Sequence, residues 1–159
     1  MRDVAITVLL FLLALSAFAQ TSPPKALYAA GVSVNPGGSP MVAGTGLAAR
    51  LIADSGTYAF TAIDALPTTF KPFAVTTQIS GGIAQRIVTI GQIPIYVPTS
   101  AGISYNGTNA GWAWTTGAMA VVRAKGPWRV LPNVRLVKSS VSNGAGYQVI
   151  GGILIGWGE

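Results

Sequence analysis

The sequence contains no cysteine and no histidine, and only 9% of its residues are charged. Without cysteine the chain has neither disulfides nor thiolate chemistry, and without histidine it has no imidazole base and almost no route to a zinc site. We therefore expect no catalytic residues, no metal site and no cofactor. The low charge, against about 25% in typical domains, indicates that much of the surface faces something other than water.

Acidic residues are scarcer than basic ones: ten Lys or Arg stand against four Asp or Glu, which gives a net charge of +6. Such an excess suits nucleic acid, an anionic glycolipid or simply basic loops. No Lys/Arg cluster singles out nucleic acid, so we do not expect a nucleic-acid partner. At 159 residues, half of them hydrophobic, the chain has the length of one domain.

The first nineteen residues have the pattern of a cleavable signal peptide. An apolar run over Val4–Leu15 follows Arg2, and residues 17–19 read Ala-Phe-Ala, an A-x-A cleavage site. The run of about twelve residues is too short to cross a hydrocarbon core of about 30 Å as a helix. We expect removal of residues 1–19 on export and a single domain over residues 20–159. This domain lacks a run of about eighteen apolar residues, so it could span a membrane only as strands.

The mature sequence alternates between apolar and polar or small residues, which is the period of a β-strand. The clearest segment begins at Phe73, where the odd positions are mostly apolar and the even ones mostly small or polar. The alternation keeps its phase through Gly81-Gly82, so we predict one long strand there instead of a hairpin. Pro94 and Pro98 each remove a ladder hydrogen bond and predict an irregular stretch in the next strand.

Turn signals rich in Gly, Pro, Asn and Asp divide the mature chain into eight predicted strands. One signal, at residues 66–69, reads Leu-Pro-Thr-Thr and follows the third strand. The predicted spans are 26–34, 41–54, 57–64, 72–88, 93–105, 110–124, 128–141 and 147–157. An even-numbered antiparallel meander closes by pairing its first and last strands, which leaves no unprotected edge. We therefore predict an all-β fold, a single antiparallel up-and-down β-barrel of about eight strands.

The aromatic residues indicate which way the apolar face points. If the chain begins on the periplasmic side, Tyr28, Tyr58, Trp128 and Trp157 fall near the periplasmic ends of strands, whereas Phe73, Tyr105, Trp112, Trp114 and Tyr147 fall near the outer ends. Such belts are typical of outer-membrane barrels, where aromatic girdles flank an apolar band of about 25 Å. The predicted band contains Leu47, Leu51, Ile79, Ile83, Ile95, Val97, Ala118, Ala120, Val134, Leu136, Ile153 and Ile155. The opposite phase, with Gly44, Gly46 and Gln78, predicts a narrow interior.

In this arrangement the mature chain resembles, over nearly its whole length, the small eight-stranded outer-membrane barrels typified by the OmpA transmembrane domain. The resemblance is architectural and involves no diagnostic motif. Such barrels commonly end on an aromatic residue after alternating apolar positions; here the alternation reaches Trp157, and Gly158 and Glu159 follow. The resemblance implies a monomer that contacts outer-membrane lipid or lipopolysaccharide and is inserted by the barrel assembly machinery.

The same phase directs a group of charged side chains into the barrel: Arg50, Arg86, Arg123, Arg135 and Asp54, with Asp64 as a further acidic candidate. Buried charges must be paired or hydrated. The functional interpretation is a polar plug or gate in the interior, or an electropositive lining that attracts anions. The alternative, which we favour, is ionic or water-mediated packing that simply fills a narrow lumen. We interpret Asp54 and Asp64 as turn caps in preference to a pair of catalytic carboxylates.

From these patterns we expect a non-enzymatic outer-membrane β-barrel with an envelope-structural role or minor, porin-like permeability to small solutes or anions. The alternative is a secreted soluble β-barrel, periplasmic or extracellular, that binds a small apolar or anionic ligand inside. Solubility of the mature chain without detergent separates these two hypotheses.

Overall fold

The computed structural model describes residues 24–35, 41–70, 73–141 and 147–159, and the predicted signal peptide lies outside them. The strands are β1 (Ala26–Asn35), β2 (Met41–Ala53), β3 (Thr57–Phe70), β4 (Phe73–Ile90), β5 (Ile93–Tyr105), β6 (Ala110–Ala120), β7 (Val122–Arg123), β8 (Trp128–Ser139) and β9 (Gln148–Gly158). Both β6 and β7 pair with β8, and only Val121 separates them, so they form one side of the same ladder.

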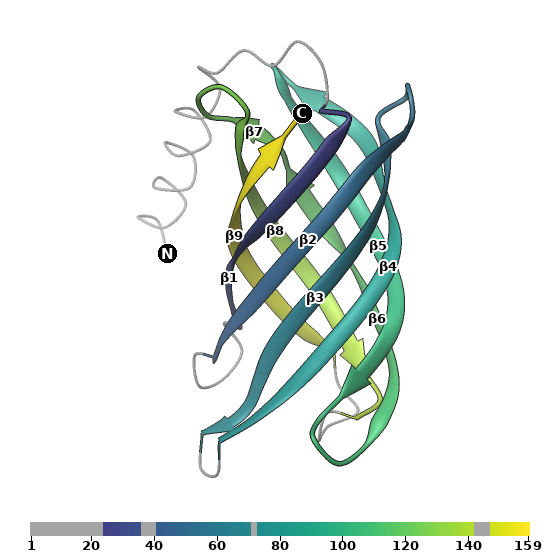
Figure 1. Cartoon of the computed structure of the whole chain (residues 1–159), viewed down its shortest axis with the longest axis vertical. Coiled ribbons are helices and arrows are strands. Elements are labelled where there is room, and N and C mark those ends of the chain that lie inside the picture. The colour runs from purple at the N-terminus through teal and green to yellow at the C-terminus, as the bar shows by residue number, and fades with distance from the viewer. Residues whose placement is uncertain (1–23, 36–40, 71–72, 142–146) are drawn as a thin grey trace.

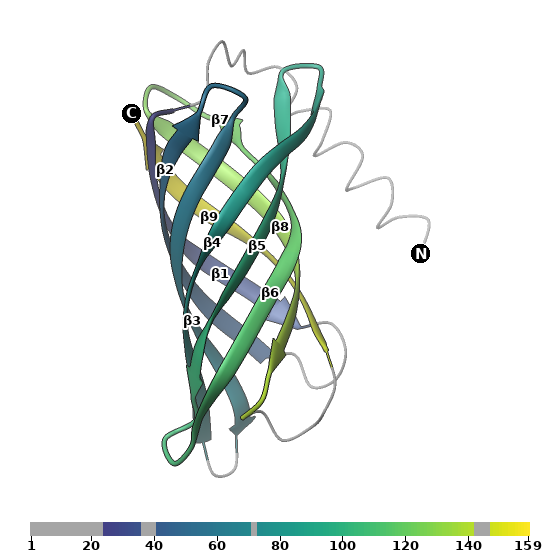
Figure 2. The same ribbon diagram turned by 90° about the vertical axis from the view of Figure 1, so that its right-hand side faces the viewer.

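The strands form a closed antiparallel barrel. With β6 and β7 taken together as one strand, each strand pairs with its neighbour along the chain and β1 pairs with β9, so the sheet closes with eight strands. The strands run obliquely around the barrel, as Figure 1 and the quarter-turn view in Figure 2 show. Closure leaves no free sheet edge among the strands that the structure describes. The predicted fold class is therefore confirmed, including the pairing of the first and last strands.

The barrel has two distinct ends, which we call the terminal end and the loop end. The terminal end, uppermost in Figure 1, holds the start of β1, the end of β9 and the connections β2–β3, β4–β5 and β7–β8. The loop end holds the start of β2, the end of β8 and the connection β5–β6. These four connections each contain one glycine with a positive φ angle, namely Gly56, Gly91, Gly126 and Gly107, a conformation that glycine adopts without steric cost.

β3 is longer than the sequence pattern indicated. It continues to Phe70, so the turn predicted at residues 66–69 is wrong. Leu66 is buried in the interior near the loop end and helps to hold this extension. The extension tolerates Pro67 because the β3–β4 register shifts between Pro67 and Thr69, and such irregularities accept a residue without an amide hydrogen.

β4 and β5 bear out two local predictions. β4 runs unbroken through Gly82, and a Cβ added there would overlap the Thr99 carbonyl of β5, so close strand approach requires glycine. The irregular stretch predicted around Pro94 and Pro98 is present as well. The β5–β6 pairing is interrupted after Tyr96 and resumes at Thr99, which spans the second proline.

Candidate functional site: the outer belt and the closed lumen

Large apolar side chains cover the outer face of the barrel and remain exposed. Eight of these residues form what we call the outer belt, and each has between 43% and 65% of its own surface exposed. They are Val32, Ile63, Ile79, Ile83, Ile103, Val134, Ile153 and Ile155. Among the described residues, charged side chains with the outward phase keep to the two ends, at Arg50 and Glu159 on one side and Lys138 on the other. Soluble monomers rarely expose contiguous apolar patches larger than a few hundred Å². The outer belt is therefore suited to an apolar surrounding.

Three aromatic residues predicted for the periplasmic belt lie on the outer face at the terminal end: Tyr28, Trp128 and Trp157. The Trp128 and Trp157 rings meet edge to face with their centroids 5.6 Å apart. Tyr58 was assigned to the same belt, and this assignment is wrong. Its side chain is 3% exposed inside the barrel, and its hydroxyl donates a hydrogen bond to the Pro24 carbonyl over 2.6 Å. The lumen at this end is apolar, so an aromatic side chain fits either face.

The loop end carries the second aromatic group on the outer face, formed by Tyr105, Trp112, Trp114 and Tyr147. Lys138 lies among them, with its Nζ 4.8 Å from the ring centroid of Tyr147 and 5.8 Å from that of Trp112. A cation over aromatic faces at the end of an apolar belt is amphipathic, as interfacial residues are. Phe73 begins β4, but its side chain lies outside the described residues.

β2 has the opposite phase to the one predicted. Leu47 and Leu51 pack against the interior cluster, whereas Gly44 and Gly46 face open space outside. Arg50 shares the outward phase and is exposed, so the prediction that it lies inside is wrong. The error has a physical cause: β2 alternates leucine with small residues, and an apolar lumen accepts leucine as readily as lipid does.

The lumen is filled along its length by two kinds of side chain. From the terminal end inward it holds an apolar plug, which comprises Leu27, Ala49, Tyr58, Phe60, Ala62, Ala84, Tyr96, Met119, Val121, Leu131 and Leu154. Nearer the loop end follows a polar layer of Thr45, Asp64, Gln78, Thr115 and Arg135, all at most 8% exposed. Small barrels of eight strands are normally filled in this way.

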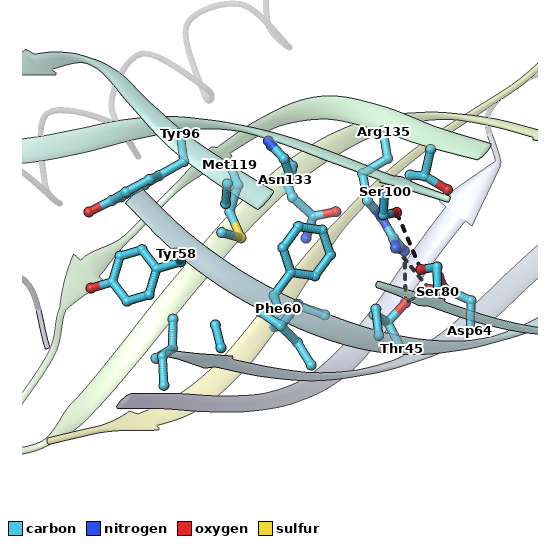
Figure 3. Close-up of a pocket in the computed structure, with 18 of the residues that line it drawn as sticks. Thr45, Tyr58, Phe60, Asp64, Ser80, Tyr96, Ser100, Met119, Asn133 and Arg135 are labelled. Carbon is cyan, nitrogen blue, oxygen red and sulfur yellow. Dashed lines mark hydrogen bonds and ion pairs between the residues drawn. The ribbon is translucent and has the colours of Figure 1, made fainter. Parts of the chain in front are cut away.

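The polar layer is organised by one ion pair (Figure 3). Arg135 Nη1 lies 2.8 Å from Asp64 Oδ1, and Arg135 Nη2 donates to Thr45 Oγ1 over 2.7 Å. The Thr45 hydroxyl in turn donates to Asp64 Oδ1 over 2.6 Å, so β2, β3 and β8 meet in a closed triangle of hydrogen bonds. The charge of Arg135 is thereby met by a carboxylate, as a buried charge requires.

This triangle corrects the assignment of the acidic residues. Asp64 is 2% exposed and pairs with Arg135, so its interpretation as a turn cap is wrong. Asp54, predicted to lie inside, is exposed in the β2–β3 connection. Thr45 was missed because the predicted phase of β2 placed it outside; a correct phase for that strand would have brought it to the interior.

The remaining predicted arginines lie apart from Arg135, at the inner rim of the terminal end. The guanidinium of Arg86 lies against the β2–β3 connection, where a Cβ added to Gly56 would come within 3.1 Å of Arg86 Cζ. Arg123 Nε donates to the Gly126 carbonyl over 3.3 Å, and Arg129 Nη1 donates to the same carbonyl over 3.0 Å. Arg129 was not anticipated. Of the predicted interior charge cluster, Arg135 thus lies in the polar layer, Arg86 and Arg123 lie at the rim, and Arg50 and Asp54 are exposed.

A cavity of about 40 Å³ is lined by side chains of both the plug and the polar layer, and Figure 3 shows the side chains around it. Asn133 Oδ1 and Arg135 Nε are buried there without a protein partner among the described residues. A cavity of this size admits the ordered water that such atoms usually bind.

Comparison of the chain with protein-family models, with curated proteins and with solved structures finds no match. In the part of the chain that the structure describes, no helix is long and apolar enough to cross a membrane. Those same residues provide no group of three or more His, Cys, Asp or Glu side chains that could hold a metal ion. The fold defines the class of the protein as a small, closed, eight-stranded antiparallel β-barrel.

Proposed function

We propose that the mature chain is a non-enzymatic protein of the bacterial outer membrane, an envelope-structural barrel with at most minor permeability. The observation that carries this proposal is the outer belt, which is exposed and apolar around the barrel, while outward charges among the described residues keep to its ends. In water such a surface would drive association, whereas lipid satisfies it without any partner.

The height of the apolar band supports the same environment. On β9 and the residue before it, the aromatic side chains Tyr147 and Trp157 are separated by ten residue steps. At about 3.3 Å per residue and a strand tilt of about 40°, that distance corresponds to about 25 Å along the barrel axis. The apolar band of outer-membrane barrels has about this height.

The filled lumen supports a structural role over transport. Among the described residues, the cavity lined by the apolar plug and by Arg135 and Asp64 measures about 40 Å³. The same filling disfavours the alternative of a soluble barrel with a ligand inside, because binding pockets usually measure about 300–1,000 Å³.

Fractionation tests the location. We expect the mature protein in the outer-membrane fraction, extractable only with detergent, and running on a gel at different positions before and after boiling, as a stable barrel does. Depletion of the barrel assembly machinery should lower the folded fraction. Recovery of folded, monomeric protein from the soluble fraction without detergent would contradict the proposal and favour the soluble barrel.

Export is the second part of the proposal. The Ala-Phe-Ala sequence at residues 17–19 should direct cleavage before Gln20. Mass spectrometry of the protein from the envelope fraction should therefore find Gln20 at the N-terminus, and an intact Met1 there would contradict cleavage.

A further inference from the structure

A groove of about 600 Å³ lies on the outer face over β1, β2 and β3. Small residues form its floor, among them Gly46, Ala48 and Thr61, and Ala48 pairs in register with Thr61. Larger side chains stand on either side, with Trp157 of β9 on one flank and Ile63 and Ile79 on the other. The barrel wall is hollowed here because small outward residues coincide on neighbouring strands.

A cation lies just beyond the groove, toward the terminal end. Arg50 is the next outward residue after Ala48 on β2 and pairs in register with Ala26 and Ala59. It is exposed and forms no salt bridge with any described residue. A ligand with an apolar chain in the groove would place a charged end group beside this guanidinium.

The terminal end of the barrel as a whole also carries an excess of positive charge. The terminal end carries Lys25, Arg50, Arg86, Arg123, Lys125 and Arg129 against Asp54 and Glu159. At the loop end, Lys138 is the charged residue of the outer face among those described. An anionic group near the membrane surface is therefore attracted to the terminal end.

We propose that this groove holds one acyl chain of an anionic glycerophospholipid and that Arg50 binds its phosphate-bearing headgroup. The inference rests on the proposed function, because it requires lipid around the barrel. The shape favours a chain over a second copy of the protein, since two identical grooves placed face to face enclose a void. The groove volume also lies within the range of about 300–1,000 Å³ that is usual for sites of small ligands.

Groove and arginine have separate tasks in this site. Every bilayer lipid offers acyl chains, so the groove gains no hydrophobic energy that distinguishes one lipid from another and contributes by close packing. Selectivity comes from Arg50, and one basic residue near an anionic headgroup corresponds to a preference of about fivefold. The two contributions can therefore be removed independently.

The test is native mass spectrometry of the mature, folded barrel in detergent with equal amounts of phosphatidylglycerol and phosphatidylcholine of identical acyl chains. We expect one retained lipid, with phosphatidylglycerol preferred about fivefold. Arg50→Gln should bring the ratio close to one, while Ala48→Trp should remove the adducts of both lipids. The matched controls are Lys138→Gln, at the opposite end, and Ala118→Trp, at an exposed outward position on β6; both should behave like the wild type.

The boiling-dependent gel shift verifies that each variant is folded. If Ala48→Trp does not fold, Gly46→Leu replaces it, because a Cβ at Gly46 meets no atom within 4 Å. Equal lipid ratios for Arg50→Gln and the wild type, or equal lipid retention by the Ala48→Trp and Ala118→Trp variants, would overturn the inference. Failure of the wild type to insert into phosphatidylcholine vesicles would instead contradict the proposed function, and insertion without lipid preference contradicts the lipid site alone.

Discussion

The outer belt and the polar layer are built from alternate residues of the same strands, yet they accommodate charge in opposite ways. On β8, Val134 is 56% exposed on the outer face, and the adjacent Arg135 is 8% exposed within the lumen. Outside, no partner could meet a charge in the middle of the belt. Inside, Asp64 and Thr45 lie within hydrogen-bonding distance of the guanidinium. Charge is thus tolerated where neighbouring strands supply its partners.

Apolarity, by contrast, does not distinguish the two faces. The plug inside the terminal half contains Leu27, Leu131 and Leu154, all at most 3% exposed, and the outer belt is equally rich in aliphatic residues. The two faces differ in the contacts that their side chains make. Inward side chains are enclosed by other side chains of the barrel, whereas outward side chains remain exposed. Substitutions that exchange these conditions should therefore have the largest effects.

The largest effect is expected when the ion pair is broken from one side. Asp64→Ala leaves Arg135 buried without its carboxylate, which should lower the free energy of unfolding by about 3–5 kcal/mol. Urea unfolding of the barrel in lipid vesicles measures this change. Asp54→Ala, in the exposed β2–β3 connection, is the matched control and should change stability by no more than about 0.5 kcal/mol.

A charge introduced into the outer belt should have the next largest effect. Ile83, 50% exposed near the middle of β4, faces the proposed lipid. Ile83→Arg should cost about 2–4 kcal/mol in the same unfolding assay, because lipid cannot pair or hydrate the guanidinium at that depth. Thr108→Arg, in the exposed β5–β6 connection, provides the comparison. Equal tolerance of both substitutions would indicate that water, not lipid, surrounds the belt.

The sequence predicted the structure correctly where the alternation of apolar and polar residues matched the different surroundings of the two barrel faces. Closure, strand order and the unbroken β4 followed from alternation and turn chemistry, and Arg135 was placed inside from its phase. On β2 the phase could not be derived, because Leu47 and Leu51 satisfy a lumen that is itself apolar. Tyr58 was misplaced for the same reason.

The sequence pattern also could not predict which residues contact each other across the interior of the barrel. Asp64 and Arg135 are 71 residues apart, and Thr45 and Arg135 are 90 apart. Alternation gives the face on which a residue lies but not its height along a tilted strand. Their contact depends on the register of several consecutive pairings, which period alone does not determine.

A smaller effect is expected from the aromatic pair at the terminal end. The Trp128 and Trp157 rings lie edge to face on neighbouring strands, and such pairs contribute about 0.5–1.5 kcal/mol beyond the area that they cover. A double-mutant cycle of Trp128→Ala and Trp157→Ala should return a coupling energy in this range. A coupling indistinguishable from zero would show that each ring contacts its lipid surroundings independently of the other.

The smallest effect is expected for Arg86→Ala on ion conductance. Arg86 lies at the rim beside Gly56, whereas the lumen beyond it is closed by Phe60, Tyr96 and Leu131. In planar bilayers the wild type should conduct only weakly and intermittently. Arg86→Ala should leave that conductance unchanged, because the apolar plug stays in place. Phe60→Ala combined with Tyr96→Ala should raise it, with a preference for anions that the fixed positive charges at the rim impose. Large, steady, cation-selective currents from the wild type would contradict the closed lumen. An increase in conductance from Arg86→Ala alone would instead indicate that Arg86 at the rim, and not the apolar plug, obstructs the lumen.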